Sequence, residues 1–165
     1  MMKGSETTHA GTMNFFIEGP SLQQASVCIP IVRSLPDWFG LEAAILHYSI
    51  EIDHLPTWLA CDAGRVLGFV SLKQHTPYSA EIYVMGILPQ AHRRGIGRAL
   101  FNQSQAWLKD RSVEYLQVKT LGPSQPDANY AKTRAFYEAM GFRPLEEFEQ
   151  IWDEFNPCLV MVKKL

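Results

Sequence analysis

The sequence predicts a single α/β domain built on a mixed, mostly antiparallel central sheet of six to seven strands, with helices on both faces. Three observations support this fold class. Apolar residues recur at helical spacing in four segments, six other segments have strand-like apolar runs, and three of those runs are joined by hairpin-length links. Because helical and strand segments are interleaved in a chain of 165 residues, the helices should cover one shared sheet.

Turn-forming residues separate the expected elements. Pro36 and Gly40 divide the first two helices, short turns at 62–64 and 75–77 join the first three strands, and Gly141 suits the left-handed end of the last helix. In chain order we expect helices at 23–33 and 41–53, strands at 56–62, 66–74 and 80–88, a helix at 95–109, a strand at 113–120, a helix at 130–140, and strands at 142–152 and 157–165. Residues 1–12 are small and polar, so we expect a flexible tail followed by one domain at 13–165.

The composition argues against several functional classes. The net charge is −2 and the pI is about 6.2, so the surface has no general positive field for nucleic acid or anionic membranes, and we expect neither as a partner. No apolar run suggests a signal peptide or a membrane span. The cysteines Cys28, Cys61 and Cys158 are widely separated, and His47 and His54 lack companion ligands. We therefore expect no disulfide and no metal, and a cytoplasmic protein.

The segment HRRGIGRALF, residues 92–101, predicts a binding site for a diphosphate. It follows an apolar strand and opens a helix, where free backbone N–H groups and the helix dipole attract anions. Gly95 and Gly97 leave room for a ligand, and Arg93, Arg94 and Arg98 add donors. His92 is a further candidate donor.

Two better-known phosphate loops do not match this segment. No Lys-Ser or Lys-Thr pair follows the glycines, as a P-loop requires, and Leu100 stands where a dinucleotide-binding loop needs its third glycine. Two other interpretations are open. The segment could be a helix that starts with Gly and Arg on a solvated face, or, as a weaker idea, the arginines could bind nucleic acid, which predicts a steep salt dependence.

The loop His92–Gly97 resembles that of the GNAT superfamily of N-acetyltransferases, whose pattern is Q/R-x-x-G-x-G/A, with His92 in place of the opening residue. The strand VMGILP before it and the segment TRAFYEAMGF, residues 133–142, also resemble this family. The likeness covers most of the chain. It implies a GNAT-like acyltransferase fold and acetyl-CoA as cosubstrate, bound by Ile87, Leu88, His92, Arg93, Arg94, Gly95, Ile96, Gly97, Arg98, Ala99, Thr133 and Phe136. Tyr130 stands where the family often has an asparagine that contacts the coenzyme.

The resemblance also implies catalytic residues for acetyl transfer to a primary amine in a ternary complex. Tyr137 occupies the family's general-acid position, and a phenol with a pKa of about 10 can donate a proton at pH 7. Glu81 has the offset of a catalytic glutamate found in some relatives. His75 and a chain of waters are alternative bases. A backbone N–H of Ile87 or Leu88 would stabilise the oxyanion. Tyr137 could instead be a core aromatic residue, and Glu81 a solvated residue at a strand start.

The expected partner is an amine acceptor whose identity is open. The first two helices and the last hairpin carry aromatic and acidic residues that would suit a cationic amine: Trp38, Phe39, Tyr48, Trp152, Phe155, Glu42, Glu51, Asp53, Glu146, Glu147 and Glu149. The same charges could equally be solvated surface. An alternative function is a non-catalytic acyl-CoA sensor or partner module. A monomer and a homodimer are both compatible with the sequence.

Overall fold

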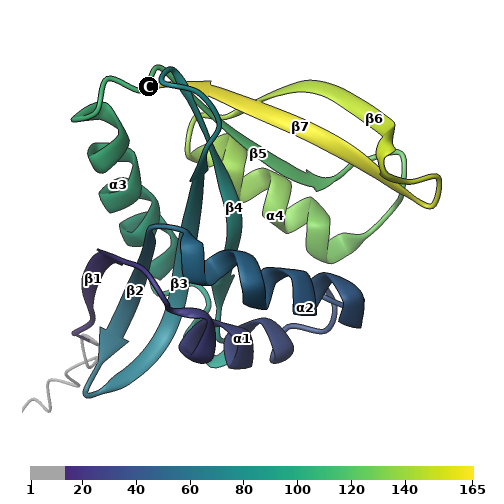
Figure 1. Cartoon of the computed structure of the whole chain (residues 1–165). Coiled ribbons are helices and arrows are strands. Elements are labelled where there is room, and N and C mark those ends of the chain that lie inside the picture. Colours follow the sequence, from purple (N-terminus) through teal and green to yellow (C-terminus); the bar gives the residue numbers. More distant parts are fainter. Residues whose placement is uncertain (1–13) are drawn as a thin grey trace, which may run out of the picture.

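A computed structural model describes residues 14–165, and the predicted tail at 1–12 lies outside them. Helices and strands are interleaved along the chain, as Figure 1 shows. The strands are β1 (Phe16–Ser21), β2 (Thr57–Asp62), β3 (Arg65–Gln74), β4 (Ser79–Ile87), β5 (Tyr115–Leu121), β6 (Arg143–Asp153) and β7 (Asn156–Lys164). The helices are α1 (Ala25–Arg33), α2 (Glu42–Glu51), α3 (Ile96–Lys109) and α4 (Ala128–Ala139), with short 3₁₀ turns at Ile52–His54 and Pro89–Ala91.

The seven strands form one sheet in the order β1-β2-β3-β4-β5-β7-β6. Every neighbouring pair is antiparallel except β4 and β5, which are parallel because α3 crosses between them. The predicted mixed, mostly antiparallel sheet is confirmed.

Helices cover both faces of the sheet, as predicted. Helices α1 and α2 pack on one face, around a cluster that includes Ile31, Ile45 and Phe69. Helices α3 and α4 contribute to the core on the other face, which includes Leu100, Tyr137 and Leu116. A ligand bound between the strands would therefore contact different side chains on the two faces of the sheet.

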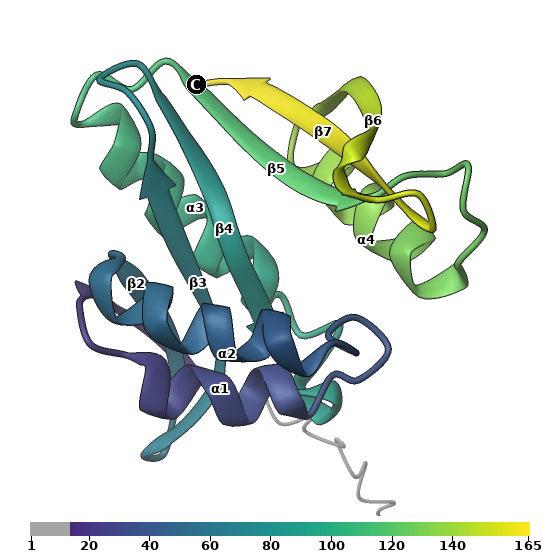
Figure 2. The same ribbon diagram turned by 45° about the vertical axis from the view of Figure 1, so that its right-hand side comes forward.

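Strands β4 and β5 separate halfway along their length, and this separation positions the site (Figure 2). They pair only from Ser79 and Tyr115 to Ile82 and Val118. Directly after Ile82, the register between β3 and β4 shifts, so that Tyr83 is an extra residue on β4. Because a bulge bends and twists its strand, it accounts for the point at which β4 leaves β5.

One strand was missed by the sequence analysis. Strand β1 lies at the sheet edge and pairs with β2, whereas the sequence predicted a helix as the first element. Gly19 and Pro20 interrupt this strand, and five of its six residues are exposed, so it has no alternating pattern. An edge strand tolerates proline because one side of its backbone is unpaired.

The predicted helix boundaries are close to those observed. The last helix begins two residues earlier than expected, because the Asp127 side chain accepts a hydrogen bond from the Tyr130 backbone N–H and caps the helix. Gly141 follows that helix with φ of +97°, which confirms the predicted left-handed end. Within residues 14–165, no helix combines the length and apolar character needed to cross a membrane.

Candidate active site

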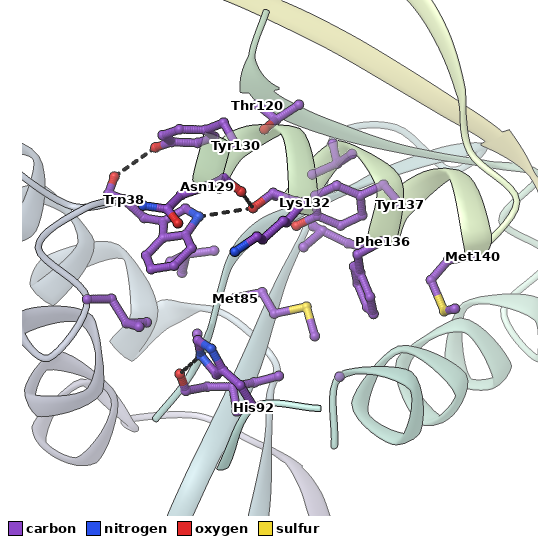
Figure 3. Close-up of a pocket in the computed structure, with 18 of the residues that line it drawn as sticks. Trp38, Met85, His92, Thr120, Asn129, Tyr130, Lys132, Phe136, Tyr137 and Met140 are labelled. Atoms are coloured by element: carbon purple, nitrogen blue, oxygen red, sulfur yellow. Dashed lines mark hydrogen bonds between the residues drawn. The ribbon is translucent and has the colours of Figure 1, made fainter. Parts of the chain in front are cut away.

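A cavity of about 650 Å³ lies where β4 and β5 have separated (Figure 3). Its walls come from both strands, the start of α3, the inner side of α4 and the loop at 34–41 between α1 and α2. The charged side chains that line it are Arg93, Arg98, Lys119 and Lys132. The cavity therefore combines apolar walls with positive charge, much of it at the phosphate-loop end.

The loop before α3 has the geometry of an anion site. Arg93 and Gly95 both have left-handed backbone conformations, with φ of +61° and +79°. Among residues 14–165, no hydrogen-bond acceptor is recorded for the backbone N–H groups of Ile96, Gly97 and Arg98 at the start of the helix. Free N–H groups at a helix start and after a left-handed turn form a concave site for an anion.

Most of the predicted coenzyme residues line the cavity. These are Ile87, His92, Arg93, Gly95, Ile96, Gly97, Arg98, Thr133 and Phe136. Leu88, Arg94 and Ala99 do not line it. The predicted loop, strand end and helix are thus brought to one place by the fold.

Two side chains of this loop face neighbouring protein groups. The Nη2 atom of Arg94 lies 4.0 Å from a carboxylate oxygen of Asp62, at the turn between β2 and β3. Nε2 of His92 lies 2.7 Å from the carbonyl oxygen of Ile87. Because a carbonyl only accepts, this nitrogen carries the proton. The imidazole therefore ties the loop to the end of β4.

Gly97 is also required for packing. A Cβ atom at this position would lie 3.1 Å from the ring of Phe136 and 3.2 Å from the side chain of Ile87. The first turn of α3 therefore sits directly against α4 and β4. The sequence predicted Gly97 as a residue that leaves room for the phosphate. Close packing against Phe136 and Ile87 is a second reason for a glycine at this position.

The backbone of β4 presents polar groups to the cavity. The Leu88 N–H donates to the Leu67 carbonyl at 2.8 Å, so it is not free for an oxyanion. In an antiparallel ladder the bonded residues alternate, so Met85 and Ile87 direct their N–H and C=O groups away from β3 and toward the gap. Of the two predicted oxyanion donors, only Ile87 has a suitably placed N–H.

Tyr137 projects from α4 into the cavity and is 7 % exposed (Figure 3). Its ring packs against Phe136 and Phe142, with centroids 5.4 and 5.6 Å away. No hydrogen-bond partner is recorded for its hydroxyl within residues 14–165. Burial, with a smaller effect of Tyr130, raises the pKa of Tyr137 above its usual value of 10. The phenol is therefore protonated at neutral pH and can act as a proton donor.

Trp38 connects three parts of the site. Its indole N–H donates to the Thr133 hydroxyl at 3.0 Å, and its ring meets the ring of His92 edge-on with centroids 6.1 Å apart. Its carbonyl accepts a hydrogen bond of 2.8 Å from the Tyr130 hydroxyl. Sequence analysis placed Trp38 only on the acceptor rim. Contacts across 92 and 95 residues of chain leave no local pattern that could have predicted this role.

Tyr130 holds the loop between α1 and α2 against α4. Burial, assisted by Tyr48 and Asp127, raises its pKa to about 12. Tyr130, which stands at the position where the family often has an asparagine, thus donates its hydroxyl hydrogen bond to the Trp38 carbonyl. Both Tyr130 and the neighbouring Asn129 line the cavity.

We expect this tyrosine to make the protein less stable at alkaline pH. Since its folded pKa is raised, its contribution is complete below pH about 10 and is lost as the pH rises toward 12. The melting temperature should therefore fall more between pH 8 and 11 in the natural protein than in Tyr130→Phe. Equal decreases would contradict the assignment.

Glu81 lies beside the cavity in a charged cluster and is 5 % exposed. Its carboxylate is 2.6 Å from Nε2 of His75 and 3.2 Å from Nζ of Lys119. It does not line the cavity, although its neighbours Lys119 and Tyr83 do. The two candidate bases from the sequence, Glu81 and His75, are thus in direct contact, and His75 reaches the surface with 35 % of its side chain exposed.

The proposed acceptor rim separates into aromatic and acidic parts. Trp38, Phe39, Tyr48 and Trp152 line the cavity, whereas Phe155 is exposed outside it. No acidic side chain of residues 14–165 is among the lining residues. Several acids have other roles: Glu42 pairs with Arg33, Glu51 pairs with Lys73, and Asp53 accepts from the Ala25 N–H. The acidic half of the predicted rim is therefore not part of this cavity.

Comparison of the sequence with known proteins identifies relatives among acetyltransferases. A mycothiol acetyltransferase of Beutenbergia cavernae is 36 % identical over 90 residues, which cover 53 % of this chain and 28 % of that protein. An uncharacterised N-acetyltransferase of Chlorobaculum tepidum is 25 % identical over 133 residues, covering 77 % of this chain and 79 % of the relative. The chain thus spans less than a third of the first relative's length.

Solved structures show the same fold. A GNAT-family protein from Desulfovibrio desulfuricans superposes with a TM-score of 0.80 at 17 % identity, covering 92 % of this chain and 99 % of that one. The family model described as an acetyltransferase (GNAT) domain matches residues 53–144, which are 92 of the 165 residues. This range holds the bulged strand, the phosphate loop and Tyr137. The chain belongs to the GNAT acetyltransferase family.

Proposed function

We propose that the chain transfers the acetyl group of acetyl-CoA to a primary amine by direct attack in a ternary complex, and that residues 13–165 act as one catalytic domain. The observation that carries the proposal is the continuous cavity that runs from the positively charged loop at α3 to the buried phenol of Tyr137. Acetyl-CoA fits this cavity: its diphosphate would lie at the positively charged loop, its flexible arm along the walls, and its thioester near Tyr137.

Each wall of the cavity has a separate task in this proposal. The N–H groups of Ile96, Gly97 and Arg98, with the Arg93 side chain, would hold the diphosphate. The Ile87 N–H would meet the negative charge that develops on the carbonyl oxygen. Tyr137 would give its proton to the departing thiolate, which is a better leaving group once protonated.

The three cysteines favour direct transfer over an acyl-cysteine. All three are buried, and none is among the cavity-lining residues. Burial raises the pKa of Cys28 to about 12 and that of Cys158 to about 11, so neither forms the nucleophilic thiolate near pH 7. Three free thiols also support a reducing cytoplasm as the compartment.

The amine must lose a proton, and we propose that the His75–Glu81 pair receives it through water. The pair is connected to the cavity by Lys119, which contacts Glu81 and lines the cavity, and His75 connects it to solvent. Replacing Glu81 by Gln keeps the size but removes the base, so turnover should fall about 10-fold or more with unchanged affinity for acetyl-CoA. Stopped or continuous thiol-release assays measure the rate. Glu114→Gln, at an exposed position, is the matched control, and a normal rate for Glu81→Gln would assign the base elsewhere.

The function is tested by thiol release with acetyl-CoA across a panel of small amines, amino acids, aminoglycosides and peptides. For an accepted amine, initial rates at several concentrations of both substrates should give intersecting double-reciprocal lines, as a ternary complex requires. Parallel lines would indicate an acyl-enzyme. Binding of acetyl-CoA without turnover on any member would favour the sensor function.

A further inference from the structure

We propose that the hydroxyl of Thr120 binds the pantetheine arm of the coenzyme close to its thioester end. Thr120 is then a coenzyme-positioning residue that neither the loop motif nor the helix motif includes. The inference rests on the proposed function, because it assumes that acetyl-CoA occupies the cavity.

Thr120 has an unsatisfied polar group in a buried position. The residue is 2 % exposed, and its Oγ1 atom is shielded from solvent with no hydrogen-bond partner recorded in residues 14–165. Buried hydroxyls almost always have a partner, since leaving one without a partner is costly. Thr120 nevertheless lines the cavity, and rotation about its Cα–Cβ bond would turn the hydroxyl toward a bound molecule that supplies that partner.

Thr120 lies on β5 beside the gap between the two strands. The last paired residue of β5 against β4 is Val118, so Thr120 comes two residues after the strands separate. Figure 3 shows it near the end of β5, on the side of the pocket where α4 carries Tyr130 and Tyr137. No backbone of β4 is available at this level to pair with or cover it.

Side chains alternate between the two faces of the sheet along β5, and this places Thr120 on the face proposed for the coenzyme. Leu116, Val118 and Thr120 point to the same face of the sheet, and the first two pack in the cluster that contains Tyr137. Lys119 points to the other face, where it contacts Glu81. That second face carries Tyr48 and Tyr83, the aromatic side of the proposed acceptor site.

The coenzyme would run along the first face, from the start of α3 to Tyr137 on α4. A threonine hydroxyl both donates and accepts, and the arm of coenzyme A carries amide N–H and C=O groups in its thioester half. A hydrogen bond to one of them would satisfy Oγ1 and hold the arm against β5. The amine, entering from the opposite face, would meet Lys119 and the tyrosines instead.

The test compares Thr120→Val, which keeps the branched shape but removes the hydroxyl, with Thr120→Ser, which keeps the hydroxyl. Calorimetric titration with coenzyme A should show binding to Thr120→Val weakened about 5- to 10-fold and binding to Thr120→Ser within about 2-fold of the natural protein. The KM for the amine should not change. Since Thr120→Val removes an unsatisfied group, the coenzyme-free protein should melt about 2–4 °C higher.

The outcomes separate this inference from the proposed function. If the natural protein binds no coenzyme A, the proposed function fails and this inference fails with it. If the natural protein binds and Thr120→Val binds equally well, the inference alone is overturned, whatever the melting temperature does. A raised KM for the amine with unchanged coenzyme affinity would also overturn it, because the hydroxyl would then serve the acceptor.

Discussion

Replacing Tyr137 by Phe is expected to lower the rate of acetyl transfer by about 10²-fold or more while leaving affinity for acetyl-CoA almost unchanged. The phenol is neutral at pH 7, and burial raises its pKa further above the usual value. It opens into the cavity without a hydrogen-bond partner within residues 14–165. Phe keeps the ring packing against Phe136 and Phe142 and removes only the proton donor. Saturating turnover and calorimetric titration measure the two quantities separately.

The matched control is Tyr78→Phe, which removes a phenol hydroxyl from an exposed tyrosine in the turn between β3 and β4. Its turnover should equal that of the natural protein. If Tyr137→Phe also keeps normal turnover, the acid is another group. If it loses coenzyme binding to the same extent as turnover, Tyr137 serves binding and not proton transfer.

Placing a carboxylate in the phosphate loop is expected to have the largest effect on binding. In Gly95→Asp the new charge faces the site proposed for a diphosphate, and two charges about 4 Å apart at an effective dielectric constant near 20 interact by about 4 kcal/mol before screening by salt. We expect acetyl-CoA affinity to fall about 100-fold. Gly95 suits this experiment because an added Cβ would contact nothing within 4 Å.

Gly95→Asn is the control for this charge effect. Asn and Asp have nearly the same shape, and both tolerate the left-handed conformation that Gly95 adopts with φ of +79°. The Asn variant should therefore lose less than about 10-fold in affinity, and the difference between the two variants should shrink at high salt. Equal losses in both variants would show that backbone conformation, and not charge, controls binding at this loop.

The sequence predicted much of the fold because its local patterns agree with the structure. Ten of the eleven main helices and strands were predicted near their observed positions. These predictions depended on the apolar periods of strands and helices, on the turns between β2, β3 and β4, and on Gly141. Strand β1 was the exception, since a Gly-Pro interruption at an exposed edge removes the alternation on which such predictions depend.

The site was predictable where it depends on local sequence. The loop at 92–97 and the helix that carries Tyr137 were found through short motifs, and the fold brings them to one cavity. The sequence could not predict how side chains from distant segments would pair. It did not show that His92 would bond to the Ile87 carbonyl or that Arg94 would face Asp62. Nor did it show that Trp38 would contact both Thr133 on α4 and His92 in the phosphate loop.

The Leu88 and Glu81 predictions show the same limit. Whether a backbone N–H is free depends on the register between β3 and β4, and the register directs the Leu88 N–H to Leu67. The contact between Glu81, His75 and Lys119 depends on three neighbouring strand segments. Neither feature can be predicted from the spacing of residues along one strand.

The central claim is that the gap between β4 and β5 binds acetyl-CoA, and calorimetric titration of the purified protein with acetyl-CoA tests it most directly. We expect binding with a stoichiometry near one per chain, weakened strongly in Gly95→Asp and only slightly in Gly95→Asn. Absence of binding in the natural protein, or identical affinities in all three proteins, would contradict the account.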